Sequence, residues 1–226
     1  MDMYKELRQQ VIDASRLIQR KGLIRGTSGN ISLRSADGAA IAITPSGIEY
    51  EELTWDMIPL IDEAGNVIPC EANETVLAKG YKPSSEVLMH TAVLRARGDA
   101  AAVVHTHSKF STLLSFLGQE LPVMTIPMIA YFPTPAPIVP FELPGSAALA
   151  EAAVMGLGAR GNAVILEKHG LLTVGKTLEK ALTCTEYIEE GAEYVYLLRA
   201  AGSPVEGIDH AKIREMLDIL KSGRAL

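Results

Sequence analysis

The chain has 226 residues, of which 48% are apolar, with 27 acidic and 21 basic side chains that give a net charge of -6. The apolar fraction excludes global disorder, and the acidic balance offers no basic surface for nucleic acid or for a membrane. No apolar run is long enough to span a bilayer, and the charged N-terminus lacks the features of a signal peptide. Two cysteines without CxxC spacing indicate a reducing compartment, so we expect a cytoplasmic protein with small-molecule partners.

Apolar periodicity and chain breakers predict helices that alternate with short strands. Apolar residues recur at three- and four-residue steps near the N-terminus, which is typical of an amphipathic helix. The short β-like runs that follow are separated by turn signals, so we expect a partly antiparallel sheet. The predicted strands are 31–33, 39–43, 57–67, 101–107, 162–167 and 171–174, and the predicted helices are 3–21, 85–95, 108–116, 146–156, 177–200 and 209–220.

Seven prolines fall between residues 122 and 144. This density argues against a helix or a central strand there, and we expect a long crossing loop, a kind of segment that is often functional. Nothing in the sequence divides the chain. We therefore expect one domain over residues 1–226, with a core at about 5–200 and a tail helix at about 209–220.

Two glycine motifs match nucleotide-binding patterns. Residues 170–177 satisfy the P-loop expression GxxxxGK[ST], but the intervening Leu-Leu-Thr-Val is typical of a strand whose amides bond to neighbouring strands. Residues 156–161 match GxGxxG, but they follow a helix and precede a strand, which is the reverse of the dinucleotide-binding order. A P-loop nucleotide binder therefore stays open only as an alternative.

Three histidines stand at the ends of apolar strands. His105 and His107 project to the same side of one strand by period-two alternation, and His169 ends another. If these strands are neighbours, the three rings converge and leave a coordination position open, as in catalytic zinc sites. His90 is a candidate fourth ligand on a helix, although a structural role suits it better, and His210 lies in the tail.

Three segments of small, hydroxyl-bearing residues are candidate anion sites. Ser84 and Ser85 precede Glu86 at a predicted helix N-terminus, where backbone donors favour anions. Two glycine-containing turns, at 26–30 and 44–47, have similar chemistry, although each alone is only a turn. Together with the histidines they favour a phosphorylated substrate.

These motifs, GTSGNIS, ITPSG, PSSE, AAVVHTHS and EKHGLLTVG, occur in the order and spacing of the class II aldolase/epimerase (aldolase II/adducin head) family, which the chain resembles from about residue 5 to 200. The resemblance implies a three-layer αβα sandwich around a mostly antiparallel sheet, and a homotetramer with active sites at subunit interfaces. It also implies one Zn²⁺, or another divalent metal, per chain.

The resemblance assigns roles residue by residue. Glu86 is implied as the acid/base, and the phosphate-binding residues are implied to be Gly29, Asn30, Ser46, Gly47, Ser84 and Ser85. The implied metal ligands are His105, His107, His169 and Glu86.

The implied activity is reversible cleavage of a ketose 1-phosphate to dihydroxyacetone phosphate and an aldehyde, with a fuculose, deoxyribulose or methylthioribulose 1-phosphate as substrate. At the position of a tyrosine that protonates the aldehyde oxygen in related enzymes, this chain has Ile126; Tyr131, five residues later, is the candidate replacement. The alternatives are a pentulose-phosphate 4-epimerase or a dehydratase, and, in another class, a non-catalytic oligomeric module. The epimerases use an aspartate in this region, and the chain has none between Asp99 and Asp209.

Overall fold

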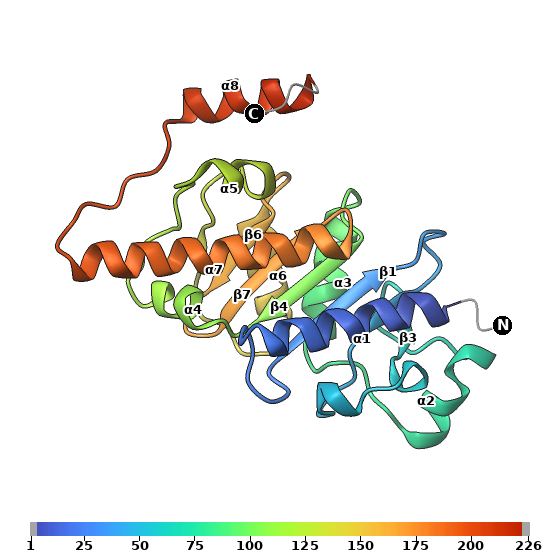
Figure 1. Ribbon diagram of the computed structural model, residues 1–226. Helices are drawn as coiled ribbons and strands as arrows, with labels where there is room; N and C mark the ends of the chain where they lie inside the picture. The colour runs from blue at the N-terminus through green and yellow to red at the C-terminus, as the bar shows by residue number, and fades with distance from the viewer. Residues whose placement is uncertain (1–3, 223–226) are drawn as a thin grey trace.

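A seven-stranded sheet runs through the middle of the molecule in the order β3-β2-β1-β4-β7-β6-β5 (Figure 1). Every neighbouring pair is antiparallel except β5 and β6, which confirms the mostly antiparallel sheet. The computed structural model describes residues 4–222, so both ends of the predicted domain and the start of the first predicted helix lie outside the described residues. The strands are β1 Gly29–Arg34, β2 Ile41–Ile43, β3 Leu60–Ile61, β4 Ala102–Thr106, β5 Ile138–Val139, β6 Ala163–Leu166 and β7 Gly170–Gly175.

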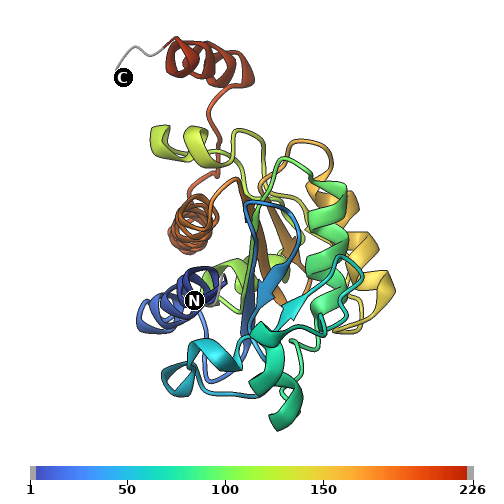
Figure 2. The same ribbon diagram turned by 90° about the vertical axis from the view of Figure 1, so that its right-hand side faces the viewer.

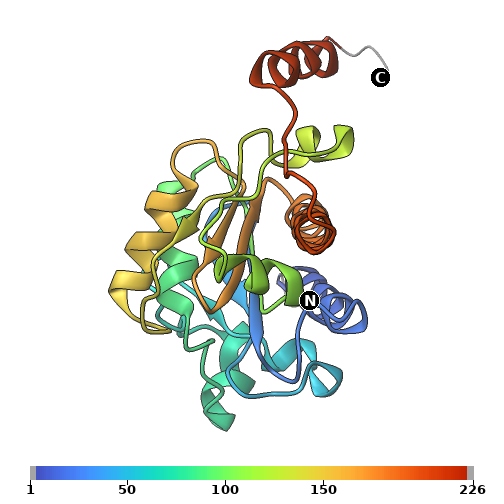
Figure 3. The ribbon, with the colours of Figure 1, turned by 90° about the vertical axis from the view of Figure 1, so that its left-hand side faces the viewer.

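Helices cover both faces of the sheet and make three layers. Figures 2 and 3 show α1 and α7 against one face and α3 and α6 against the other. The helices are α1 Lys5–Arg20, α2 Glu74–Lys79, α3 Val87–Ala96, α4 Lys109–Ser115, α5 Ile126–Tyr131, α6 Ala147–Leu157, α7 Leu178–Ala200 and α8 His210–Lys221.

The central strand β4 is buried along its whole length because it has a helix layer on each side. Alternation along β4 directs Ala102 and Val104 into the core under α1, and Val103 into the core under α3 and α6. His105 continues the series of Val103. The same geometry therefore brings this histidine to the α3 side, at the end of the strand.

The proline-rich segment contains more regular structure than the sequence predicts. Helix α5 lies inside it, so the expectation of a loop without a helix is wrong. Its proline, Pro127, occupies the first turn, where the missing N–H would have had no helical partner. Strand β5 is also within the segment, but it lies at the edge of the sheet and bonds on one side only, where proline is tolerated.

The predicted strand over 57–67 is much shorter in the structure. Only Leu60–Ile61 is a strand, and a turn begins at Asp62, whose carboxylate accepts hydrogen bonds from the amides of Ala64 and Asn66 at 2.9 and 2.8 Å. Such a side-chain cap competes with strand pairing. The sequence does not predict the short helix α2.

The tail helix α8 stands away from the body of the molecule (Figure 1), and Ile213 is its only buried residue. Across residues 4–222, none of the helices has the length and apolar character needed to cross a bilayer.

Candidate metal and active site

The candidate site forms where β4, β7 and α3 meet. His105 is paired with Asn30 of β1 on one side and with Leu172 of β7 on the other. His169 directly precedes β7, so the neighbouring strands expected from the sequence are present. A Cβ atom at Gly170 would lie 2.2 Å from the carbonyl oxygen of Thr106, so only glycine allows β7 to approach β4 this closely beside His169.

Four side chains converge at this point. The Nε2 atoms of His105 and His107 lie 3.0 Å apart, and the carboxylate of Glu86 lies 3.2 Å from Nε2 of His105 and 3.4 Å from Nε2 of His169. One potential ligand atom from each of the four residues lies within 4.8 Å of all the others. For comparison, metal–nitrogen bonds of about 2.0–2.1 Å in a tetrahedron separate two ligand atoms by about 3.3–3.4 Å.

Burial keeps the three imidazoles neutral. It lowers the pKa of His105 well below its usual value and also lowers the pKa of His107 and of His169. Nδ1 of His105 lies 3.0 Å from the carbonyl oxygen of Leu171, which can only accept, so Nδ1 carries the hydrogen and Nε2 presents a lone pair.

The lone pair of His105 therefore faces a carboxylate oxygen of Glu86, an arrangement that is unfavourable without a cation between them. Oε1 of Glu86 and Nδ1 of His169 are also buried without a hydrogen-bond partner among the described residues. Buried polar atoms are rarely left so. The donor set, three neutral imidazoles and one carboxylate, fits a divalent ion such as zinc.

Glu86 is held from the side of β1. It is the N-cap residue of α3, and Nδ2 of Asn30 donates to its Oε2 at 2.9 Å. Oδ1 of the same amide lies 2.5 Å from Nε2 of His90, whose Nδ1 lies 2.7 Å from the hydroxyl of Ser32. His90 is thus bonded to two polar side chains outside the four-residue cluster. The sequence interpretation did not single out Ser32, although the alternation of Asn30 and Ser32 in β1 places both polar side chains on one face.

The structure brings the three candidate anion-binding segments together. The amide of Ser46 donates to Lys82 and the amide of Ser84 donates to Thr44, at 2.9 and 3.0 Å, so turn 44–47 lies beside residues 82–84. The amide of Ile31, directly after segment 26–30, donates to the hydroxyl of Thr44 at 3.2 Å and ties the third segment to this turn. The residues expected to bind phosphate divide by exposure: Gly29, Asn30 and Ser84 are buried, while Ser46, Gly47 and Ser85 are exposed.

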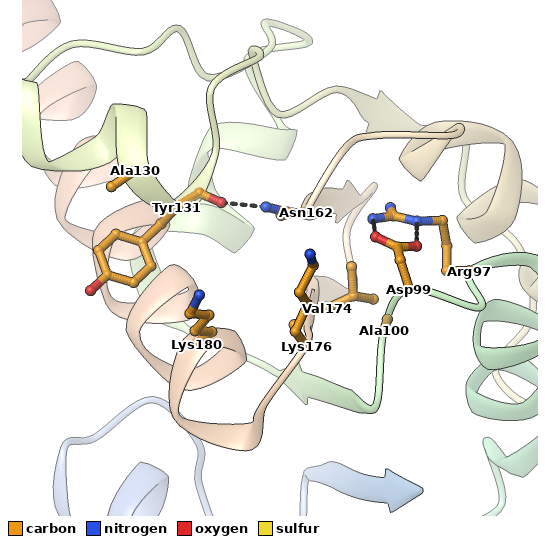
Figure 4. A pocket seen from close by; sticks show the side chains of 10 residues that line it. Arg97, Asp99, Ala100, Ala130, Tyr131, Asn162, Val174, Lys176 and Lys180 are labelled. Atoms are coloured by element: carbon orange, nitrogen blue, oxygen red, sulfur yellow. Dashed lines mark hydrogen bonds and ion pairs between the residues drawn. The ribbon is translucent and has the colours of Figure 1, made fainter. Parts of the chain in front are cut away.

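Tyr131 lies at the opposite end of the sheet from the histidine cluster of the same chain. It lines an open pocket with Lys176, Lys180 and Asn162, and its carbonyl accepts a hydrogen bond from Asn162 at 2.7 Å (Figure 4). The pocket lies where Ala102 pairs with Gly175, four strand positions from Thr106, which corresponds to about 13 Å. Tyr131 therefore lies away from the site that its own chain forms.

The P-loop-like motif is not a phosphate-binding loop. Its residues 170–175 form β7, which pairs with β4 and with β6. Thr177 is the N-cap of α7 and accepts a hydrogen bond from the amide of Lys180 at 3.2 Å. The motif is therefore a strand followed by a helix cap, as its apolar residues indicate.

Comparisons with known proteins agree with this architecture. A model of the class II aldolase and adducin N-terminal domain matches residues 9–196. The chain is 34% identical to a 5-deoxy-D-ribulose 1-phosphate aldolase of Bacillus thuringiensis, over 87% of each chain. It is also 34% identical to an L-fuculose phosphate aldolase of Escherichia coli K12, over 96% of this chain and 95% of the other. A solved structure of an L-fuculose 1-phosphate aldolase superposes with a TM-score of 0.82 at 29% identity, covering 96% of each chain.

Proposed function

Because the chain belongs to the class II aldolase and adducin N-terminal domain family, we propose that it is a zinc-dependent aldolase that reversibly cleaves a ketose 1-phosphate to dihydroxyacetone phosphate and an aldehyde. That the chain is a lyase of carbohydrate metabolism follows from relatives that are named aldolases along most of its length. The observation that carries the finer proposal is the convergence of three neutral histidines and one carboxylate within 4.8 Å.

The proposed substrate is a 5-deoxy-, 5-methylthio- or 6-deoxyketose 1-phosphate. Sequence identity does not choose between a deoxyribulose and a fuculose phosphate, because relatives named for each are equally similar at 34%.

The proposed metal ligands are His105, His107, His169 and Glu86. A divalent cation held there would supply Lewis-acid stabilisation of the negative charge that develops on the substrate oxygens during cleavage. Glu86 moves a proton on and off the carbon that lies next to the carbonyl group of dihydroxyacetone phosphate. Its buried position beside α3 keeps water away from this proton.

The phosphate group is proposed to bind where the three hydroxyl-bearing segments meet. The exposed residues Ser46, Gly47 and Ser85 lie at the rim of this region, with Ser84 and Gly29 behind them. The two ends of the Asn30 amide bond to Glu86 and to His90. We therefore assign Asn30 to phosphate binding through its position in β1 and its remaining N–H group, and not through its carbonyl oxygen.

The proposed assembly is a cytoplasmic homotetramer whose active sites lie at subunit interfaces. The location of Tyr131 supports this proposal. The pocket that it lines is about 13 Å along the sheet from the cluster of its own chain. As the proton donor to the aldehyde oxygen, Tyr131 would serve the site of a neighbouring subunit.

Replacing Glu86 with glutamine tests the proposed chemistry. We expect Glu86→Gln to keep its metal on the three histidines and to lose about 10²–10⁴-fold in kcat for ketose 1-phosphate cleavage. Glu63→Gln is the matched control, because Glu63 has a 60% exposed side chain and lies outside the site. Unchanged turnover in Glu86→Gln would remove this residue from the mechanism.

A further inference from the structure

Four buried side chains form one continuous hydrogen-bonded chain that ends on Glu86. Ser32, His90, Asn30 and Glu86 are connected in this order at 2.7, 2.5 and 2.9 Å. Ser32 and His90 are fully buried, and Asn30 and Glu86 are each 5% exposed. Two come from β1 and two from α3 and its N-cap, so the chain joins the sheet to the helix directly beside the candidate metal site.

The direction of donation along this chain is determined by the carboxylate, which as an anion only accepts. The Asn30 amide therefore donates its N–H to Oε2 of Glu86 and turns its carbonyl oxygen toward His90. That oxygen needs a donor, so Nε2 of His90 carries the hydrogen. Nδ1 is then the acceptor for the Ser32 hydroxyl.

His90 suits this role because it stays neutral. Burial lowers the pKa of His90 to about 3, so near pH 7 the ring has one N–H donor and one lone pair. With Nδ1 accepting from the Ser32 hydroxyl, the ring can only donate to the Asn30 carbonyl oxygen through Nε2. An apolar residue in its place would leave the buried carbonyl oxygen of Asn30 without a donor, and the amide would lose the partner that holds it against Glu86.

The two oxygens of Glu86 consequently have different surroundings. Oε2 accepts the hydrogen bond from Asn30, whereas Oε1 is buried and has no hydrogen-bond partner among the described residues. Oε1 lies 3.4 Å from Nε2 of His169 and has two lone pairs, so one can face the metal site while the other takes up a proton. Protonation of Oε2 would instead compete with an existing hydrogen bond.

We propose that His90, anchored by Ser32, is a positioning residue that holds the Asn30 amide against Oε2 of Glu86 and so makes Oε1 the oxygen that exchanges a proton with the substrate carbon. In this step the proton moves from carbon to Oε1, the C–H electron pair stays with dihydroxyacetone phosphate, and the reverse transfer restores the carboxylate. The inference rests on the proposed function, because it requires Glu86 to be the acid/base.

The test compares two replacements of His90 in the full-length, metal-loaded enzyme. His90→Leu removes both ring nitrogens, whereas His90→Gln keeps a donor and an acceptor at a similar separation. Proton transfer is measured by nuclear magnetic resonance as exchange of solvent deuterium into dihydroxyacetone phosphate, without any aldehyde. We expect His90→Leu to lose about 10- to 100-fold in exchange rate and kcat, as for other partners that orient a site residue, and His90→Gln to stay within a few-fold of wild type.

Metal content and KM separate positioning from a general structural defect. Both variants should retain metal, because no metal ligand is changed, and KM should change less than kcat in His90→Leu, because the phosphate-binding residues other than Asn30 have no bond to His90. Equal exchange rates in His90→Leu and wild type, or equal losses in both variants, would overturn the positioning role. Wild-type enzyme that neither exchanges deuterium nor cleaves a ketose 1-phosphate would instead contradict the proposed function.

A second measurement needs no variant and so does not depend on the folding of His90→Leu. The ¹⁵N shifts of the His90 ring report its tautomer in the wild-type protein. We expect the hydrogen on Nε2, opposite to His105, whose Nδ1 faces the Leu171 carbonyl. A hydrogen on Nδ1 would reverse the direction of donation from Ser32 to Glu86 and contradict the inference.

Discussion

The Nε2 atoms of His105 and His107 lie 3.0 Å apart, at the end of a strand that both helix layers cover. Burial lowers the pKa of both rings, so near neutral pH they face each other without the charge that would repel them. Nδ1 of His105 is already bonded to a carbonyl group. The arrangement of the two Nε2 atoms therefore suits binding of a cation between them.

Replacing His105 with alanine should remove the metal. We expect wild-type protein to contain about one zinc per chain and His105→Ala to contain less than a tenth of this, with a parallel loss of cleavage. Elemental analysis of the purified proteins measures the ratio. His210→Ala is the control, since His210 is exposed in the tail and should keep full metal content. A metal-free His105→Ala that retained its activity would contradict the proposed role of the metal.

Gly29 should be intolerant of a side chain. It has φ +122°, and an added Cβ would lie 2.8 Å from Cγ2 of Ile24 and 2.9 Å from the carbonyl oxygen of His105. Gly38 is the matched control, because it also has a positive φ, +72°, but has nothing within 4 Å of an added Cβ.

We expect Gly29→Ala to lower the melting temperature more than Gly38→Ala and to raise KM for the ketose 1-phosphate, because the start of β1 must shift away from β4 and the phosphate-binding turns. Thermal unfolding and steady-state kinetics measure the two effects. Equal melting temperatures and KM values in the two variants would show that the close approach at Gly29 is unimportant.

The sequence predicts the parts of the site that depend on strand alternation and on motif order. Period-two alternation places His105 and His107 together, and the motifs of the family point to Glu86. The sequence does not show the direction of the Asn30 amide. This direction depends on contacts with Glu86 and His90, which lie 56 and 60 residues after Asn30 along the sequence.

The proline-rich segment shows a second limit of the sequence. Proline density argues against a helix only where the prolines interrupt its interior, and Pro127 instead lies in the first turn of α5. Tyr131 ends this helix. The proline-rich segment carries Tyr131 away from the histidine cluster of the same chain. The sequence motifs do not specify the path of this segment.

The stability of metal-free protein should depend on pH through His90. Its pKa is about 6.5 in the unfolded chain and about 3 in the folded protein, so below about pH 6.5 the unfolded chain binds a proton that the folded protein does not. The free energy of unfolding therefore falls as pH falls through this window. From pH 7 to pH 5 the contribution of this residue is about 2 kcal/mol.

Urea unfolding at pH 7 and pH 5, with a chelator and at a fixed protein concentration, measures this dependence. The loss of unfolding free energy should be smaller by about 2 kcal/mol in His90→Gln than in wild type. Equal losses in both proteins would show that His90 is not held neutral by its burial.

Tyr131 should act across a subunit interface. We expect Tyr131→Phe to lower kcat. Tyr187→Phe should leave kcat near wild type; it removes the hydroxyl of the ring that packs beside Tyr131 at a centroid distance of 5.2 Å. If the site is shared, subunits of Tyr131→Phe mixed with subunits of Glu86→Gln should regain activity that neither variant has alone. Full activity in Tyr131→Phe, or no recovery on mixing, would exclude this role.

The central claim is tested most directly by incubating the enzyme with fuculose, 5-deoxyribulose and 5-methylthioribulose 1-phosphates and assaying released dihydroxyacetone phosphate, before and after removal of metal. We expect at least one substrate to give dihydroxyacetone phosphate and its aldehyde in equal amounts, with activity lost on chelation and restored by zinc. No release from any of them, or release that is unchanged in metal-free enzyme, would contradict the assignment.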